Sequence, residues 1–474
     1  MAESSRRGFL KTASATAAAL AVSKHVAWGA TAGPVKVWAS FRDRRYAQGA
    51  ALAWKPASAI AADAIMLDPT ATRQEILGFG AALTDASCYV LDQVPASERA
   101  EVMHDLFAPS EMGFNVCRTC IGASDYSRTA YSFDESPEPD PELKKFSIDH
   151  DKAYILPILR HARKVNPELF LFSSPWSPPG WMKSNGSMLG GAMRKHSFES
   201  YARYFLKFLE GYKSEGVAID AVTVQNEVDT DQDGRMPACL WGQEYEIDFV
   251  QNFLGPVLRK AGMATKIWVL DHNYNLWGRA IGELSIPEAA EYIDGIAWHG
   301  YVGEASAMTT VHNAFPKKSA YWTEGGPDIQ RPDYQTDYAT WAETFNGVLH
   351  NWARSITAWN VALDEKGNPN IGPFSCGGVI TVDNATKKIT RSGQYWAFAH
   401  YTKHVRRGAR VFETSGVGEG AGGPVSHIGF HNPDGSHVVV LANRGAEKQV
   451  QLVLGGQTLE LDLPADSVHT LQWA

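Results

Sequence analysis

Short apolar runs alternate with longer amphipathic stretches between about residue 75 and residue 364. This alternation is typical of repeated strand–helix units that build a parallel sheet. Stretches such as Ser197–Glu215 and Tyr245–Ala261 are the predicted helices between the runs. The strand candidates are Glu75–Leu83, Asn115–Ser124, Leu169–Ser174, Asp220–Gln225, Lys266–His272, Gly295–His299, Ala320–Thr323 and Ile356–Val361. Eight such units predict a closed (β/α)8 TIM barrel, an α/β fold that typically uses about 250 residues.

The pattern changes after about Arg407, where short runs with turn signals between them replace the strand–helix alternation. These runs are Val411–Glu413, His427–His431, Val438–Asn443, Gln449–Leu454, Thr458–Leu463 and Val468–Trp473. They predict an additional C-terminal all-β sandwich domain. The isolated apolar run Lys36–Phe41 is predicted to pair with it. We therefore expect the barrel at residues 75–405, the sandwich at 406–474, and a sandwich contribution from 31–74.

The first thirty residues carry the pattern of a targeting segment. Ser5-Arg6-Arg7-Gly8-Phe9-Leu10-Lys11 resembles a twin-arginine export signal, and an alanine-rich run follows it. We therefore expect residues 1–30 to be a signal peptide and the protein to be periplasmic or secreted. Elsewhere the sequence has no apolar run of about 18 residues, so no transmembrane span is expected.

Composition narrows the class of partner. The formal net charge of −8 argues against nucleic acid or an anionic membrane as the main partner. The chain has 15 Trp, 17 Tyr and 20 Phe, which suits sugar binding because apolar sugar faces stack on rings, although a large aromatic core would need the same residues. The five cysteines show no disulfide framework, and buried free thiols are expected.

Two glutamates stand where apolar strands end. The run Ala221–Gln225 leads into Asn226 and Glu227 on the fourth unit, and Ala320–Thr323 leads into Glu324 on the seventh. In a barrel of this kind the chemistry lies at the carboxyl ends of the strands. Two carboxylates are what glycoside hydrolysis requires, at a separation of about 5–5.5 Å when configuration is retained. The pair predicts a glycosidase, although either glutamate alone could be a solvated strand end.

Other polar and aromatic groups fall at the same predicted rim. The Asn226 amide could bind a sugar 2-hydroxyl, an interaction that strengthens in the transition state. Three prolines stiffen Ser173–Lys183, which predicts a rigid loop presenting Trp176 and Trp181 as a sugar platform, unless the loop packs its own rings. The remaining strand-end groups, expected to line a pocket, are Asp125, His272, Asn273, His299, Tyr301, Trp359 and Asn360.

Several motifs together resemble glycoside hydrolase family 30, the glucosylceramidase (acid β-glucosidase) family. The matching segments are Gly78-Phe79-Gly80-Ala81-Ala82-Leu83-Thr84-Asp85, Ser174-Pro175-Trp176-Ser177-Pro178-Pro179, Trp181-Met182-Lys183-Ser184-Asn185-Gly186, Asn226-Glu227, Thr323-Glu324-Gly325 and Trp359-Asn360-Val361-Ala362-Leu363-Asp364. A C-terminal match is Pro433-Asp434-Gly435-Ser436 with Val440-Leu441-Ala442-Asn443-Arg444. The resemblance covers roughly residues 75 to 474.

The resemblance implies a retaining β-glucosidase of the glucosylceramidase type, with Glu227 as acid/base and Glu324 as nucleophile. It also implies a glucose subsite made by Asp125, Trp176, Asn226, Tyr301 and Trp359. It implies neither a metal nor an organic cofactor, and a β-glucoside, a β-glucan or glucosylceramide as substrate. One departure is Gly300, where animal glucosylceramidases have Trp.

Three alternatives stay open. An endo-β-1,6-glucanase would use the same two glutamates on the same scaffold. A carbohydrate-binding protein without catalysis would have no need of both. A metal hydrolase would use His272, His299 and Asp271, although these residues lack metal-ligand spacing on a single element.

Overall fold

The structure is a computed structural model, and it describes residues 33–416 and 425–474. The predicted export signal at residues 1–30 lies outside the described residues.

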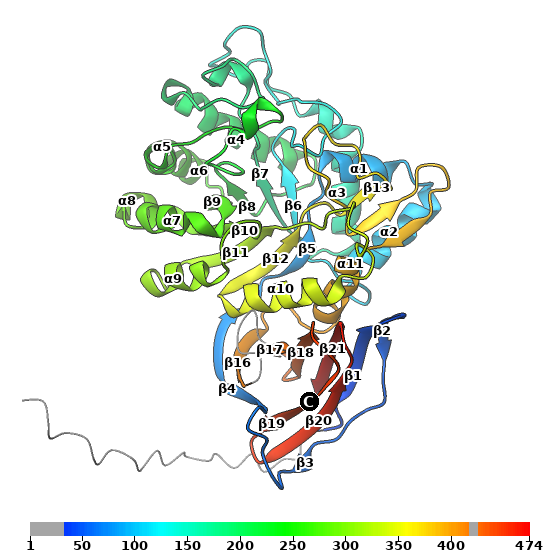
Figure 1. The fold of residues 1–474 in the computed structure, drawn as a ribbon. Coiled ribbons are helices and arrows are strands. Elements are labelled where there is room, and N and C mark those ends of the chain that lie inside the picture. The colour runs from blue at the N-terminus through cyan, green and yellow to red at the C-terminus, as the bar shows by residue number, and fades with distance from the viewer. Residues whose placement is uncertain (1–32, 417–424) are drawn as a thin grey trace, which may run out of the picture. The chain divides into compact units, whose positions relative to one another are not determined.

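Eight parallel strands form the barrel (Figure 1). They are β5 (Gly78–Ala81), β6 (Val116–Cys120), β7 (Phe170–Ser174), β8 (Ala221–Thr223), β9 (Lys266–Asn273), β10 (Ile293–His299), β11 (Ser319–Glu324) and β12 (Ala353–Ala358). The sheet order runs from β6 through β12 to β5. The first and second strands close the ring through backbone hydrogen bonds from Leu83 to Arg118 (2.8 Å) and from Asn115 to Phe79 (3.0 Å). The predicted barrel is confirmed.

Helices follow the strands and cover the barrel. They are α1 (Asp85–Asp92), α2 (Ala96–Phe107), α3 (Ile155–Val165), α4 (Phe198–Ser214), α5 (Gln243–Phe249), α6 (Gly255–Lys260), α7 (Trp277–Leu284), α8 (Pro287–Ala290), α9 (Ser306–Ala314), α10 (Tyr338–His350) and α11 (Gly393–Thr402). The predicted helix Tyr245–Ala261 is split by a π-helical turn at Val250–Leu254. Pro256 explains the turn, because proline has no N–H and its ring clashes with the carbonyl one turn earlier.

The remaining large sheet, called the β-domain below, has ten strands in the order β2-β1-β21-β18-β17-β16-β4-β19-β20-β3. They are β1 (Lys36–Phe41), β2 (Arg44–Gln48), β3 (Lys55–Pro56), β4 (Ile65–Glu75), β16 (Arg410–Ser415), β17 (Val425–His431), β18 (His437–Asn443), β19 (Lys448–Leu454), β20 (Gln457–Leu463) and β21 (Ser467–Trp473). Strand β1 pairs with β21, with Lys36 opposite Gln472, so the predicted pairing of Lys36–Phe41 is confirmed. Strand β4 was not predicted, and it takes Glu75 away from the predicted first barrel strand.

Strand β18 joins two hydrophobic cores because its side chains alternate between faces. Val439 and Leu441 enter the core of the β-domain. Val438 and Val440 enter the large core that also contains residues of α10. Helix α10 lies against β17, β18 and β21, and α11 lies against β2 and β21, so both helices stand between the barrel and the β-domain (Figure 1).

A small three-stranded sheet follows the last barrel strand and was not predicted. Its strands are β13 (Ala362–Asp364), β14 (Ile380–Val382) and β15 (Ile389–Arg391). The connection from β13 to β14 reaches back to the second barrel unit, where Ile371 N–H donates to the Asp125 carbonyl (2.8 Å). This connection therefore helps to form the rim on which Asp125 stands.

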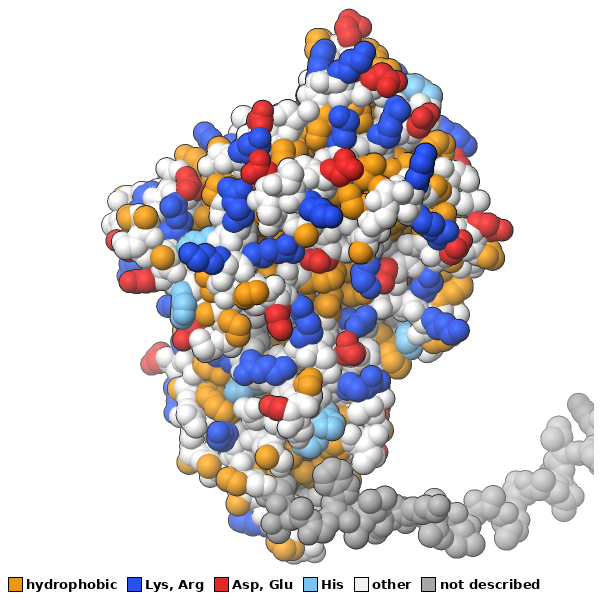
Figure 2. Space-filling view, turned by 180° about the vertical axis from the view of Figure 1, so that it is seen from behind, with side chains coloured by type: hydrophobic (Ala, Val, Ile, Leu, Met, Phe, Trp, Pro, Cys, Tyr) orange, Lys and Arg blue, Asp and Glu red, His pale blue; other side chains and the backbone are white. Residues whose placement is uncertain are grey.

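The surface, the helices and the cysteines each show one further feature. Basic, acidic and apolar side chains are interspersed on the face shown in Figure 2. Among the described residues, no helix is both long and apolar enough to cross a bilayer. All five cysteines are free thiols; four are buried, as expected, and Cys376 is partly exposed.

Candidate active site

The structure brings the two predicted glutamates to one end of the barrel. Glu324 is the last residue of β11, and Glu227 lies just after β8. His299, the last residue of β10, contacts both of them. Its Nδ1 lies 3.5 Å from Glu227 Oε1, and its Nε2 lies 3.8 Å from Glu324 Oε2. Two carboxylates that face one imidazole share one small space.

Backbone conformation helps to aim Glu227. Its φ is +54°, in the left-handed region that non-glycine residues seldom occupy. The Glu227 N–H donates to the Asp271 carbonyl at 2.9 Å, which ties this turn to β9. Asp271 also has a positive φ, +43°, next to a register shift between β9 and β10. Conformations of this kind cluster at functional sites, where surrounding contacts hold them.

Arg118, on β6, is the buried hub of the site. Its Nη1 donates to Glu324 Oε2 at 2.5 Å, and its Nη2 donates to Asn226 Oδ1 at 2.7 Å. Nη2 also donates to Asp271 Oδ2 at 2.7 Å. Arg118 was not among the predicted site residues, although its position carries a signal. An arginine inside a strand buried along its whole length requires partners.

Asp271 has hydrogen-bond partners on both carboxylate oxygens. Oδ1 accepts from His299 Nε2 (3.0 Å) and Thr323 (2.8 Å), and Oδ2 accepts from Ser174 (2.8 Å) and Arg118. Burial alone would raise the pKa of Asp271, but Arg118 and these donors outweigh burial and hold the pKa well below its ordinary value. Asp271 is therefore an ionised anchor that orients the ring of His299.

The pKa values of the two glutamates move in opposite directions. For Glu227, burial would raise the pKa, but the hydrogen bond and charge of His299 outweigh burial and lower it. For Glu324, burial raises the pKa, and His299 and Arg118 offset only part of that effect. Burial also opposes the charge on His299, yet Glu324, Asp271 and Glu227 raise its pKa to about 9. The imidazole is thus a shared cation between the carboxylates.

The other predicted subsite residues gather around this pair. The Tyr301 hydroxyl donates to Glu324 Oε1 at 3.0 Å. Asp125 is buried, and its Oδ1 has no hydrogen-bond partner. Burial, and then the charges of Glu324 and Glu227, raise the pKa of Asp125 well above its ordinary value. A buried carboxyl with one unpaired oxygen, beside the two glutamates, is suited to form hydrogen bonds with sugar hydroxyls.

The predicted tryptophan platform is wrong in its composition. Trp176 stacks on Trp359 with ring centroids 4.9 Å apart, and the two are only 2% and 1% exposed. The Arg118 guanidinium lies 4.6 Å from the Trp176 ring. Trp181 instead donates to the Asp134 carbonyl at 3.0 Å and lines a separate cleft of about 370 Å³. Trp176 and Trp359 therefore form an inner wall, and Trp181 belongs to another surface.

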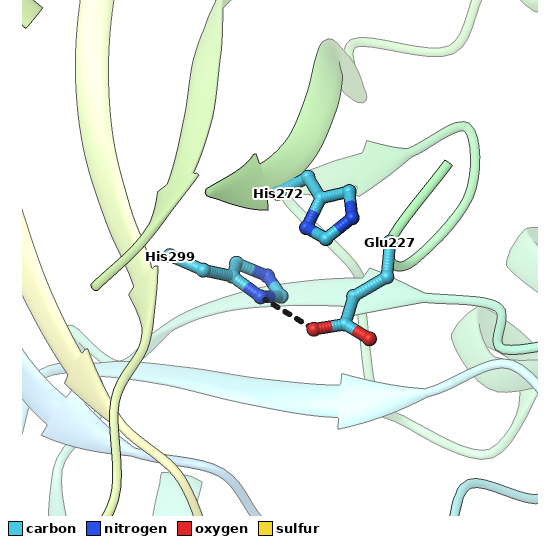
Figure 3. A group of neighbouring side chains, drawn as sticks. All are labelled: Glu227, His272 and His299. Carbon is cyan, nitrogen blue, oxygen red and sulfur yellow. Dashed lines mark ion pairs between the residues drawn. The ribbon is translucent and has the colours of Figure 1, made fainter. Parts of the chain in front are cut away.

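The metal-hydrolase hypothesis includes one wrong residue, Asp271. Asp271 is fully engaged by its donors, as described above, and does not face an open space. Glu227 takes its place: ligand atoms of Glu227, His272 and His299 all lie within 4.8 Å of one another (Figure 3). No cluster of this kind on other elements was found among the described residues.

Paired carboxylates at the carboxyl end of a (β/α)8 barrel define the site of a glycoside hydrolase. Comparison with protein families agrees. Residues 76–405 match the "Glycosyl hydrolase family 30 TIM-barrel domain", and residues 408–471 match the "Glycosyl hydrolase family 30 beta sandwich domain". The chain belongs to glycosyl hydrolase family 30.

Two groups of relatives stand out. An endo-1,6-β-D-glucanase of Neurospora crassa is 35% identical over 393 residues, which cover 79% of this chain and 80% of that protein. The lysosomal acid glucosylceramidase of Mus musculus is 28% identical, over 86% of this chain and 83% of that protein. A solved endo-β1,6-glucanase superposes with a TM-score of 0.83 at 28% identity, covering 93% of this chain and 99% of that chain. The glucanase alternative is thus better supported than the glucosylceramidase prediction.

Proposed function

We propose that this chain hydrolyses β-1,6-linked glucan with retention of configuration, using Glu227 as acid/base and Glu324 as nucleophile. The observation that carries the proposal is the contact of both carboxylates with the single imidazole of His299. Both carboxylates can therefore flank one glycosidic bond, as hydrolysis by two carboxylates requires, and retention is the outcome that the resemblance to family 30 implies.

The two roles follow from how each carboxylate is held. Both oxygens of Glu324 accept hydrogen bonds, one from Arg118 and one from Tyr301, so this carboxylate is fixed for attack on carbon. Glu227 accepts from the Gln232 side chain at 2.8 Å, and its side chain is 14% exposed. A partly exposed carboxylate can pass a proton to a leaving oxygen and later take one from water.

The reaction has two steps. In the first, Glu324 forms a bond to the anomeric carbon while the glycosidic bond breaks and Glu227 gives its proton to the leaving oxygen. In the second, Glu227 takes a proton from water, whose oxygen displaces Glu324 and regenerates it as a carboxylate. The Oδ1 of Asn226 accepts from Arg118, which leaves its amide N–H groups to bind the sugar.

Protonation must be redistributed before the first step. In the free protein the lower pKa belongs to Glu227, whereas step one uses the form in which Glu227 carries the proton. A sugar bound beside Glu227 displaces water from its exposed edge, and this desolvation raises the pKa of a carboxyl group. Substrate binding therefore favours the reactive form.

The substrate class rests on the relatives and on one feature of the rim. Three endo-1,6-β-D-glucanases match at 30–35% identity. A Cβ placed on Gly300 would lie 2.7 Å from the Trp322 ring, so the tryptophan that animal glucosylceramidases have here does not fit without movement. The rim beside Tyr301 thus differs from that of the animal type, in keeping with the glucanase relatives.

The test is hydrolysis of β-1,6-glucan, β-1,3-glucan and glucosylceramide in micelles, side by side, with the Glu324→Gln variant as control. We expect β-1,6-glucan to be cut into a ladder of oligosaccharides whose new ends are β by proton NMR. Faster hydrolysis of glucosylceramide would overturn the substrate assignment. New ends in the α configuration would overturn retention.

A further inference from the structure

Three donor groups from three consecutive barrel units converge at the site. Glu227 follows β8, His272 lies in β9, and His299 ends β10. Figure 3 shows the carboxylate of Glu227 directed toward His299, with the ring of His272 beside them. One ligand atom from each residue lies within 4.8 Å of the other two.

We propose that Glu227, His272 and His299 bind one zinc ion, and that the bound ion switches off hydrolysis. Two imidazoles and one carboxylate are a donor set that Zn²⁺ takes in proteins, with a fourth position left for water. Mg²⁺ and Ca²⁺ prefer oxygen donors, so this set discriminates against them. The inhibitory part of the inference rests on the proposed role of Glu227, whereas the binding part does not.

The spacing of the donors suits a small ion. Donor atoms bound at about 2.1 Å on a tetrahedral ion lie roughly 3.4 Å from one another. Nδ1 of His299 and Oε1 of Glu227 are already 3.5 Å apart, which is longer than a normal hydrogen bond. Nδ1 is buried, and apart from this long contact with Glu227 it has no hydrogen-bond partner. An ion between these atoms would take the place of the Nδ1 proton, which passes to solvent.

The surroundings of His299 resemble those of a metal-ligating histidine. Its second nitrogen, Nε2, donates to the Asp271 carboxylate at 3.0 Å. Metal-bound histidines usually give their other N–H to a carboxylate, which fixes the ring and strengthens the ligand. Asp271 is itself held by Arg118 and Thr323. His272 is 8% exposed, and its ring makes one long contact, 3.3 Å, with the Asn273 amide.

Zinc on Glu227 would block both chemical steps. Coordination to a dication keeps a carboxylate deprotonated and makes it a weak base, so Glu227 would carry no proton for the leaving group and would not take one from water. Zinc would therefore inhibit by occupying the acid/base, and removal of the ion would restore the activity.

The test begins without substrate. The purified chain, stripped of metal, is titrated with ZnCl2 in competition with a chromophoric chelator. We expect about one zinc per chain, unaffected by millimolar MgCl2. His272→Asn removes one ligand and should weaken zinc binding by more than about 10-fold, since even altering an outer partner of a ligand costs roughly 10–100-fold. Glu227→Gln should weaken it similarly. His196→Asn, at an exposed position, is the matched control and should bind as the parent does.

The second arm measures glucan hydrolysis with ZnCl2, followed by EDTA. We expect inhibition of the parent and the His196→Asn variant, reversal by EDTA, and an inhibitory concentration at least about 10-fold higher for His272→Asn. Equal zinc affinity in the parent, His272→Asn and Glu227→Gln would overturn the site. If these variants lose zinc binding but the parent cleaves no glucan, the zinc site stands and the proposed function is overturned instead.

Discussion

His404 is predicted to make the fold lose stability in acid. It is buried beside β1, β2 and β21; its Nε2 is 2.7 Å from the Tyr46 hydroxyl, and its Nδ1 is 3.0 Å from Gln472 Oε1. The neutral ring satisfies both partners, because Nδ1–H donates to the amide oxygen and Nε2 accepts from the hydroxyl. Burial lowers the pKa of His404 from 6.5 to about 4.

The sign and size of the effect follow by linkage. The unfolded chain binds this proton at higher pH than the folded chain does, so the stabilisation is complete above about pH 6.5 and is lost as the pH falls toward about 4. Between about pH 7 and pH 4.5 the free energy of unfolding falls by roughly 2 kcal/mol because of this single site, since one pKa unit corresponds to about 1.4 kcal/mol.

The assay is urea unfolding at these two pH values, followed by tryptophan fluorescence. His404→Asn does not titrate, so its stability should fall by roughly 2 kcal/mol less than that of the parent over the same interval. The difference between variants isolates this site from other buried histidines such as His469, whose pKa is also lowered to about 4. His196→Asn, at an exposed position, should behave as the parent. An equal loss in all three proteins would refute the reasoning.

Two further predictions concern activity and location. Tyr301→Phe removes the hydroxyl that donates to Glu324, and a hydrogen bond to a charged group is worth about 1.5–3 kcal/mol, so kcat/KM on β-1,6-glucan should fall roughly 10- to 150-fold with an unchanged Tm. A change below about 2-fold would contradict the role of Tyr301. Replacing Arg6 and Arg7 together by Lys should leave the precursor in the cytoplasm of the host, as judged by fractionation, whereas Lys11→Arg should not. Export of both variants alike would exclude a twin-arginine signal.

Much of the fold could be predicted because buried parallel strands leave nearly continuous apolar runs. All eight barrel strands lie within or overlap the predicted runs. The predicted strands are wrong where the local pattern of apolar and polar residues is ambiguous. Glu75 belongs to β4, because the polar end of that strand runs directly into the first barrel strand. Strand β4 itself carries Pro69 and polar residues, and its pairing with β16 and β19 is a long-range property.

The site was predictable where chemistry coincides with a strand end, as at Glu227 and Glu324. It was not predictable where partners come from distant strands. The role of Arg118 depends on Glu324, Asn226 and Asp271, which lie on three other units. The stacking of Trp176 on Trp359 was not predictable for the same reason. A proline-rich segment predicts a rigid loop, but it does not indicate which ring packs on that loop.

The most direct test of the central claim is the anomer formed by azide with an aryl β-gentiobioside. In Glu227→Ala the nucleophile remains, so an acidic leaving group still allows the glycosyl-enzyme to form, and azide should then displace Glu324 to give the β-glycosyl azide. In Glu324→Ala azide can only attack once from the vacated space, which gives the α-glycosyl azide. The account predicts β from the first variant and α from the second, read by proton NMR. The reverse pair of anomers, or full activity in either variant without azide, would contradict it.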